Sequence, residues 1–172
     1  MATQKVVDWI NEKFFVTKTY NKEDFEQMES FCLLWNLFEK KVADGSETSL
    51  GLSKIEKFAT KNSQYINIDN TIMEDCFNYF QNRYIENGTT NAQFDNLKFR
   101  QNDTQYSDKL KNILTNNSMS STESEKILGI LTIAYRIRNN SFHGTKELPE
   151  IVNQKETFKH FNDFLMSFLN RL

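Results

Sequence analysis

The chain has 172 residues, of which 38% are hydrophobic and 26% charged, and 15 phenylalanines provide material for a core. This composition excludes an intrinsically disordered protein, and the length suits one compact domain spanning residues 1–172. A net charge of −2 argues against a protein that holds long duplex DNA through phosphate contacts alone, but it is compatible with a short phosphate-bearing substrate.

Two features bear on the compartment of the protein. The opening stretch MATQKVVDWINEKFF has no signal-peptide pattern, and no apolar run in the chain reaches transmembrane length. We therefore expect a cytoplasmic protein with no membrane partner. Cys32 and Cys76 lie in apolar helical patterns and form no CxxC pair, which predicts two buried free thiols and neither a disulfide nor a zinc site.

The first strong helical pattern covers residues 21–42. Asn21 can cap its start, and Lys40 and Lys41 suit its negative C-terminal end. Residues of one apolar stripe recur along it at helical spacing: Phe25, Met28, Phe31, Cys32, Trp35, Phe38 and Val42. This pattern predicts a helix with one face in the core.

The middle of the chain alternates between weak and strong patterns. Residues 44–51 are typical of a turn, and Ser53 with Glu56 forms a capping box that predicts the start of a short helix. A stronger helix is predicted over residues 69–86, where the sequence ENGTTN ends it. The polar stretch 91–116 predicts one or two short helices.

Two further helices complete the pattern. Thr122 and Glu125 form a capping box ahead of an apolar stripe that comprises Ile127, Ile130, Leu131, Ala134 and Ile137. The last helix is predicted over residues 150–172, after Pro149 as a helix-start residue, and here, as in residues 69–86, apolar residues recur at helical spacing along one side. With no convincing strand pattern, the sequence predicts an all-α fold, a single helical bundle of four main helices plus short extra helices.

The stretch RIRNNSFHG, residues 136–144, combines two arginines, two asparagines and one of the two histidines of the chain. On an unbroken helix, Arg138 and His143 would point about 140° apart, so their side chains converge only if the helix kinks or stops between them. The two asparagines and the serine at 139–141 are weak helix formers, and Gly144 can adopt a left-handed helix-ending conformation. We therefore expect a break in the helix at this stretch.

An arginine and a histidine that converge at the end of a helix are suited to phosphate chemistry. A guanidinium matches phosphate oxygens, and an imidazole titrates near neutral pH, so the pair could serve the attack of a ribose 2′-hydroxyl on its neighbouring phosphate. His143 would act as general base or acid, Arg138 would stabilise the charge at phosphorus, and Asn139 would orient a reacting group. One histidine cannot fill both proton roles in a single step, which favours a homodimer.

Other residues have supporting or alternative readings. Arg136 and Lys146 flank the pair, Asn140 lies between its members, and all three are candidate substrate-binding residues for RNA phosphates. For His160, in the last predicted helix, we expect a structural or solvated role, with a second proton carrier as the alternative. No phosphate-binding glycine loop and no metal-ligand cluster is visible, so we expect neither a cofactor nor a metal.

The sequence YRIRNNSFHG resembles the signature of the HEPN superfamily (higher eukaryotes and prokaryotes nucleotide-binding domains), an arginine and a histidine separated by four to six residues. Arg138, Asn139 and His143 fall on the signature positions, and Phe142 and Gly144 match the flanking pattern of its Apea-like branch. The resemblance implies a compact helical bundle with the motif late in the chain. It further implies a homodimeric, metal-independent endoribonuclease, often a toxin or an antiviral effector.

The resemblance also extends to FCLLWNLFEKK, which is similar to an aromatic-rich early helix of the family and makes Glu39 a candidate support residue. We therefore expect a ribonuclease acting on single-stranded or loop RNA, with an antitoxin or other regulatory partner. Two alternatives stay open. One is a non-catalytic HEPN module that binds RNA, a nucleotide or a partner protein; the other is a helical interaction protein in which the motif only ends a helix.

Overall fold

The computed structural model describes residues 4–14, 18–42, 50–62, 69–116, 120–142 and 147–170. Its α-helices are α1 (Gln4–Lys13), α2 (Glu26–Val42), α3 (Leu52–Asn62), α4 (Asn70–Tyr84), α5 (Ala92–Asp95), α6 (Thr104–Thr115), α7 (Glu123–Phe142), α8 (Leu148–Val152) and α9 (Lys155–Leu169). Two short 3₁₀ helices, η1 (Lys22–Asp24) and η2 (Gln101–Asp103), and one hairpin of β1 (Ile85–Glu86) and β2 (Thr89–Thr90) accompany them. The predicted all-α bundle is confirmed.

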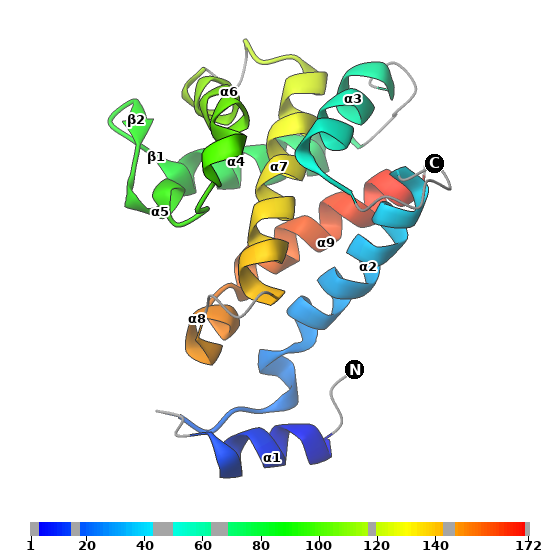
Figure 1. Cartoon of the computed structure of the whole chain (residues 1–172). Helices are drawn as coiled ribbons and strands as arrows, with labels where there is room; N and C mark the ends of the chain where they lie inside the picture. The colour runs from blue at the N-terminus through cyan, green and yellow to red at the C-terminus, as the bar shows by residue number, and fades with distance from the viewer. Residues whose placement is uncertain are drawn as a thin grey trace.

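Helix α7 runs through the centre of the bundle (Figure 1). It packs against α3, α4 and α6, while α2 packs along α9. Every residue from Lys126 to Ala134 is buried, so this part of α7 is covered on all sides. A helix covered in this way carries no polar face, and any polar side chain on it must find its partners inside the protein.

Aromatic side chains from α2, α4 and α9 form the middle of the core. Phe161 is fully buried, and its ring centroid lies 5.3 Å from that of Phe31 and 4.7 Å from that of Phe80. Burying one phenylalanine contributes about 1.5–3 kcal/mol. The apolar stripes predicted for these three helices therefore face one another, and with α7 they form one continuous core.

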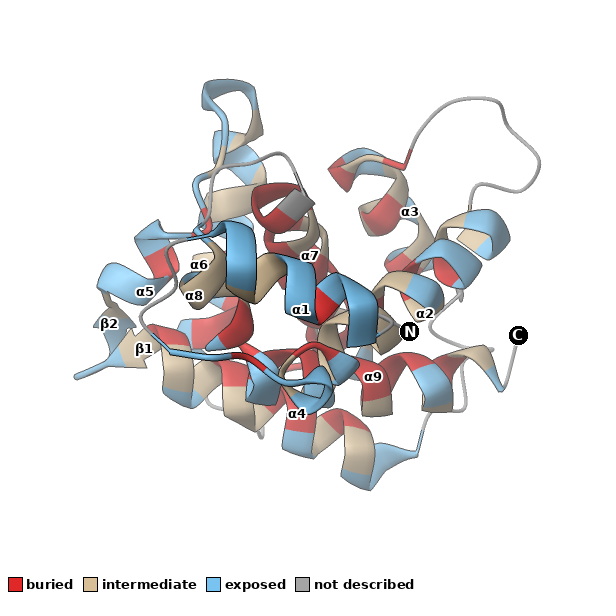
Figure 2. Cartoon of the chain, turned by 90° about the horizontal axis from the view of Figure 1, so that it is seen from below, coloured by how far each residue is buried: buried red, intermediate tan, exposed pale blue. Residues whose placement is uncertain are grey.

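Helix α1 packs against a second, smaller cluster, which comprises Val7, Tyr20, Phe25 and Val152. The side chain of Asn11 clasps the backbone of Tyr20, donating to its carbonyl at 2.8 Å and accepting from its N–H at 2.9 Å. Seen from below, α1 crosses the molecule with most of its residues exposed (Figure 2). No one-sided apolar pattern predicts α1, because its apolar residues are divided between this cluster and the solvent.

The predicted end of the second strong helix differs from the structure. Helix α4 ends at Tyr84, and the following residues form the β1–β2 hairpin, with Ile85 paired to Thr90. Asn87 and Gly88 have φ values of 52° and 76°, as a two-residue turn with two left-handed positions requires. Asn87 and Gly88, which were predicted only to end the helix, therefore form the turn of a β-hairpin.

Helix starts and ends also differ in three other places. Ser53 lies inside the first turn of α3, which begins at Leu52, so the predicted capping box does not start that helix. Asn21 caps the short 3₁₀ helix η1, because its side chain accepts from the Asp24 N–H, whereas α2 begins only at Glu26. The predicted helix over 150–172 is divided, because α8 ends at Val152 and α9 begins at Lys155. The capping box of Thr122 and Glu125 is present as predicted.

In the part of the chain that the structure describes, no helix is both long enough and apolar enough to cross a membrane.

Candidate functional site

Helix α7 carries most of the motif and continues through the weak helix formers at its middle. The helix is unbroken through residues 139–141 and ends at Phe142. Asn139, Asn140 and Ser141 are buried, with 8%, 6% and 6% of their surface exposed. Residues 139–141 therefore continue the helix, and among the described residues no break lies between Arg138 and Phe142. His143, Gly144 and Lys146 lie outside the described residues, and the predictions made for them stay predictions.

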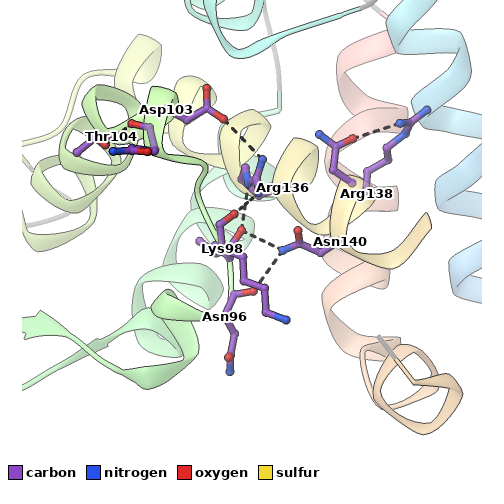
Figure 3. A network of polar contacts seen from close by, with 10 residues as sticks. Asn96, Lys98, Asp103, Thr104, Arg136, Arg138 and Asn140 are labelled. Atoms are coloured by element: carbon purple, nitrogen blue, oxygen red, sulfur yellow. Dashed lines mark hydrogen bonds and ion pairs between the residues drawn. The ribbon is translucent and has the colours of Figure 1, made fainter. Parts of the chain in front are cut away.

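Two side chains of α7 hold a loop that is about 40 positions earlier in the chain (Figure 3). The Arg136 Nε donates to the Leu97 carbonyl at 3.0 Å, and its Nη2 donates to the Lys98 carbonyl. The Asn140 Nδ2 donates to the Asn96 carbonyl at 3.2 Å and to the Leu97 carbonyl at 2.9 Å. We call Arg136 and Asn140, with the three carbonyls of residues 96–98, the carbonyl clamp.

The carbonyl clamp keeps Arg136 out of the solvent. Only 3% of the residue is exposed, its Nη1 lies 3.9 Å from Asp103 Oδ2, and its guanidinium stands 5.3 Å from the centre of the Phe99 ring. Burial lowers the pKa of Arg136 from its usual range, and the neighbouring Asp103 carboxylate opposes that shift. A cation with all these partners stabilises the fold and does not present itself to a substrate.

Arg138 points to the other side of α7, toward α2 (Figure 3). A separation of two residues turns a helical side chain by about 200°, which explains why Arg138 and Arg136 face opposite ways. The Arg138 Nη1 donates to Asn139 Oδ1 at 3.2 Å, and its Nη2 lies 3.9 Å from Glu39 Oε2. The Arg138 side chain is 32% exposed, so its remaining donors can reach an external ligand.

A pocket of about 190 Å³ opens beside the Arg138 guanidinium. Besides Arg138, it is lined by Cys32, Trp35 and Asn36 from α2. Burial raises the pKa of the Cys32 thiol, and the positive charge of Arg138 opposes that shift only in part. The thiol is therefore neutral near pH 7, and the guanidinium is the group in this pocket that can attract an anion such as a phosphate.

The structure thus divides the predicted site residues into two sets. Asn139 and Glu39 contact Arg138, which lines the pocket, whereas Arg136 and Asn140 lie on the opposite side of α7 in the carbonyl clamp. A signal in the sequence could have separated them. Arg136 follows directly on an apolar run that is hydrophobic around the whole helix, and a basic residue in such a helix is expected to be buried and paired.

His160 lies in a different part of the molecule. It stacks on Tyr79 with ring centroids 4.0 Å apart, and it lines a hollow of about 510 Å³ between α4 and α9 that no residue of the described part of the motif lines. Burial, reinforced by Lys159, lowers the pKa of His160. This placement favours the structural role expected for His160. Of the two cysteines, Cys76 is buried and Cys32 is half-buried, and both are free thiols.

Within the described residues, no group of three or more histidine, cysteine, aspartate or glutamate side chains is arranged to hold a metal ion. The chain matches no protein-family model, and no curated protein or solved structure is significantly similar to it.

Proposed function

We propose that the chain is an endoribonuclease of the HEPN type that acts on single-stranded or loop RNA, as a toxin or antiviral effector. The observation that carries the proposal is the contrast between two neighbouring arginines of RIRNNSFHG. Arg136 is buried with its donors occupied, while Arg138 offers a partly exposed guanidinium at a pocket and precedes His143 by five positions. This is the arginine on which the resemblance to the family places phosphate binding.

In the proposed reaction, the ribose 2′-oxygen attacks the adjacent phosphorus and the bond from phosphorus to the 5′-oxygen breaks. His143 accepts the proton of the 2′-hydroxyl, and Arg138 stabilises the negative charge on the phosphate oxygens. Asn139 and Glu39 position the Arg138 guanidinium, at 3.2 Å and 3.9 Å. The products are a 2′,3′-cyclic phosphate and a 5′-hydroxyl, and the 5′-oxygen needs a proton from a second group.

A second copy of the chain would supply that proton donor, and α2 offers a surface for it. Leu33 and Leu37 on this helix are 63% and 47% exposed, and Asn36 between them lines the Arg138 pocket. Glu26 lies seven residues before Leu33, and Lys40 lies seven residues after it. A two-fold axis at Leu33 would bury the leucines and pair Glu26 with the partner's Lys40, in both directions.

The nuclease proposal is tested with purified protein and a labelled single-stranded RNA in the presence of EDTA. We expect the wild type to release products with cyclic phosphate ends, lighter by one water than linear phosphates. His143→Ala lowers the rate at least about 100-fold, as does Arg138→Ala, because each removes a group that acts in the transition state. His160→Ala, the matched histidine control, keeps the rate of the wild type.

Three outcomes of this assay contradict the proposal. If folded wild type leaves RNA intact, or if His143→Ala cleaves as fast as wild type, the chain is not this enzyme. RNA binding by an inert wild type would instead support the non-catalytic module. A substrate with a 2′-deoxy residue at the cleaved position must resist cleavage, since the attacking hydroxyl is absent, and its cleavage would also overturn the mechanism.

The dimer is tested by sedimentation or light scattering. We expect Glu26→Lys to weaken self-association and the double variant Glu26→Lys with Lys40→Glu to restore it, because the paired charges are exchanged. Met166→Glu on α9, which is also an exposed apolar residue, is the matched control and keeps the wild-type mass. A monomeric wild type, or a dimer that Leu33→Glu leaves intact, would contradict this interface.

A further inference from the structure

Lys98 has an unusual backbone conformation. Its φ is +48°, and Asn87 in the hairpin turn is the other non-glycine residue with a positive φ among those described. A lysine adopts this left-handed conformation only at a cost in free energy, and such strain persists where the surroundings impose it. Two sets of contacts hold it here: the Lys98 N–H donates to the Asp95 carbonyl at 3.0 Å, and Arg136 and Asn140 of the carbonyl clamp hold the carbonyls of residues 96, 97 and 98.

The clamp places the Lys98 side chain in the solvent beside α7. Figure 3 shows it next to Asn140, on the side of α7 away from Arg138. The residue is exposed, and the structure gives its ammonium no partner among the described residues. The free charge of residues 95–103 is positive. Asp103 is paired with Arg136, which leaves Asp95 as the one carboxylate of this segment to oppose Lys98 and the exposed Arg100.

We infer that Lys98 is a further phosphate-binding residue for the RNA substrate, and that Arg136 and Asn140 are positioning residues that act through it. The inference rests on the proposed nuclease function and deepens it. The RNA strand would contact Arg138 on one side of α7 and Lys98 on the other. Arg136 and Asn140 were predicted to bind the substrate themselves. In this proposal Lys98 binds the phosphate, and Arg136 and Asn140 hold the backbone of its segment.

The test measures binding of a labelled single-stranded RNA by fluorescence anisotropy, in a His143→Ala background that prevents cleavage. Lys98→Asn and Lys98→Gly remove the charge with residues that tolerate a positive φ. We expect either variant to reduce the slope of log affinity against log salt by about 0.7, the value for one phosphate contact to a single strand. The loss of affinity relative to the parent should therefore be about eightfold larger at about 50 mM salt than at about 1 M. Lys98→Arg retains both, and so does the control Lys57→Asn, on the exposed side of α3.

Positioning is tested with a double-mutant cycle. Asn140→Ala should weaken RNA binding, and it should add nothing once Lys98→Asn is present, because its effect passes through Lys98. Unchanged affinity and slope in Lys98→Asn and Lys98→Gly, in a parent that binds RNA, would overturn the inference while leaving the nuclease proposal standing. A parent that binds no RNA would overturn both, and additive effects in the cycle would refute the positioning role.

Discussion

Replacing Arg136 by methionine tests whether the carbonyl clamp stabilises the fold. The change removes two charge-assisted hydrogen bonds to backbone carbonyls, one to Leu97 at 3.0 Å and one to Lys98, and leaves Asp103 without its cation at 3.9 Å. Hydrogen bonds to charged groups are worth about 1.5–3 kcal/mol each, and the methionine recovers part of the packing of the arginine stem. We expect the free energy of unfolding to fall by about 3–5 kcal/mol.

Urea denaturation followed by helical circular dichroism measures this loss through the shift of the midpoint at unchanged slope. Arg136→Lys keeps the charge but offers a point donor in place of a fork, so its loss should be intermediate. Arg100→Met, an exposed neighbour, should change the free energy of unfolding by less than about 0.5 kcal/mol. A loss below about 1 kcal/mol in Arg136→Met would show that water replaces the guanidinium at the carbonyls, and the reasoning would be refuted.

Three further changes test other parts of the structure by urea denaturation. Phe161→Ala removes a fully buried ring between Phe31 and Phe80 and should cost about 3–5 kcal/mol; a cost below 1 would contradict the packing. Gly88→Ala forces a side chain to φ 76° and should cost about 1–2 kcal/mol, whereas no cost would mean that the turn has another conformation. The lowered pKa of His160 means that the unfolded chain binds a proton more readily than the folded protein, so stability falls on acidification below about pH 6.5. His160→Gln should remove that part of the pH dependence, and an unchanged profile would argue against the burial of the imidazole.

The sequence predicted the fold well where the apolar pattern is long and one-sided. The stripes of α2, α4 and α9 each extend over several turns and meet in one aromatic core, so period alone located them. The elements that were missed lack such a stripe. Helix α1 is short and leaves Val6 and Trp9 exposed, and the β1–β2 hairpin consists of strands of only two residues.

The helical conformation of residues 139–141 was not predicted, for a different reason. Low helix propensity favours a break at residues 139–141. The side-chain amide of Asn140 instead donates to the carbonyls of Leu97 and Asn96, 43 and 44 positions earlier in the chain, and these hydrogen bonds stabilise the helical conformation of Asn140. No local pattern reveals a contact over that distance. The same holds for Arg136, whose charge indicated substrate binding although its side chain is buried against residues 97–103. The proximity of Glu39 to Arg138 came from a resemblance and not from periodicity.

The separate packing of α1 has a consequence for how the protein opens. The cluster that holds this helix is small, and Asn11 adds two hydrogen bonds to the backbone of Tyr20. Helices α2, α4, α7 and α9, in contrast, share the main core. Because the free energy of local opening follows the amount of buried apolar contact, α1 can detach while the rest of the bundle stays folded. Its amides should exchange with solvent hydrogen earlier than those of α7, and a protease should cut there first. The molecule is therefore one folded bundle with two levels of stability.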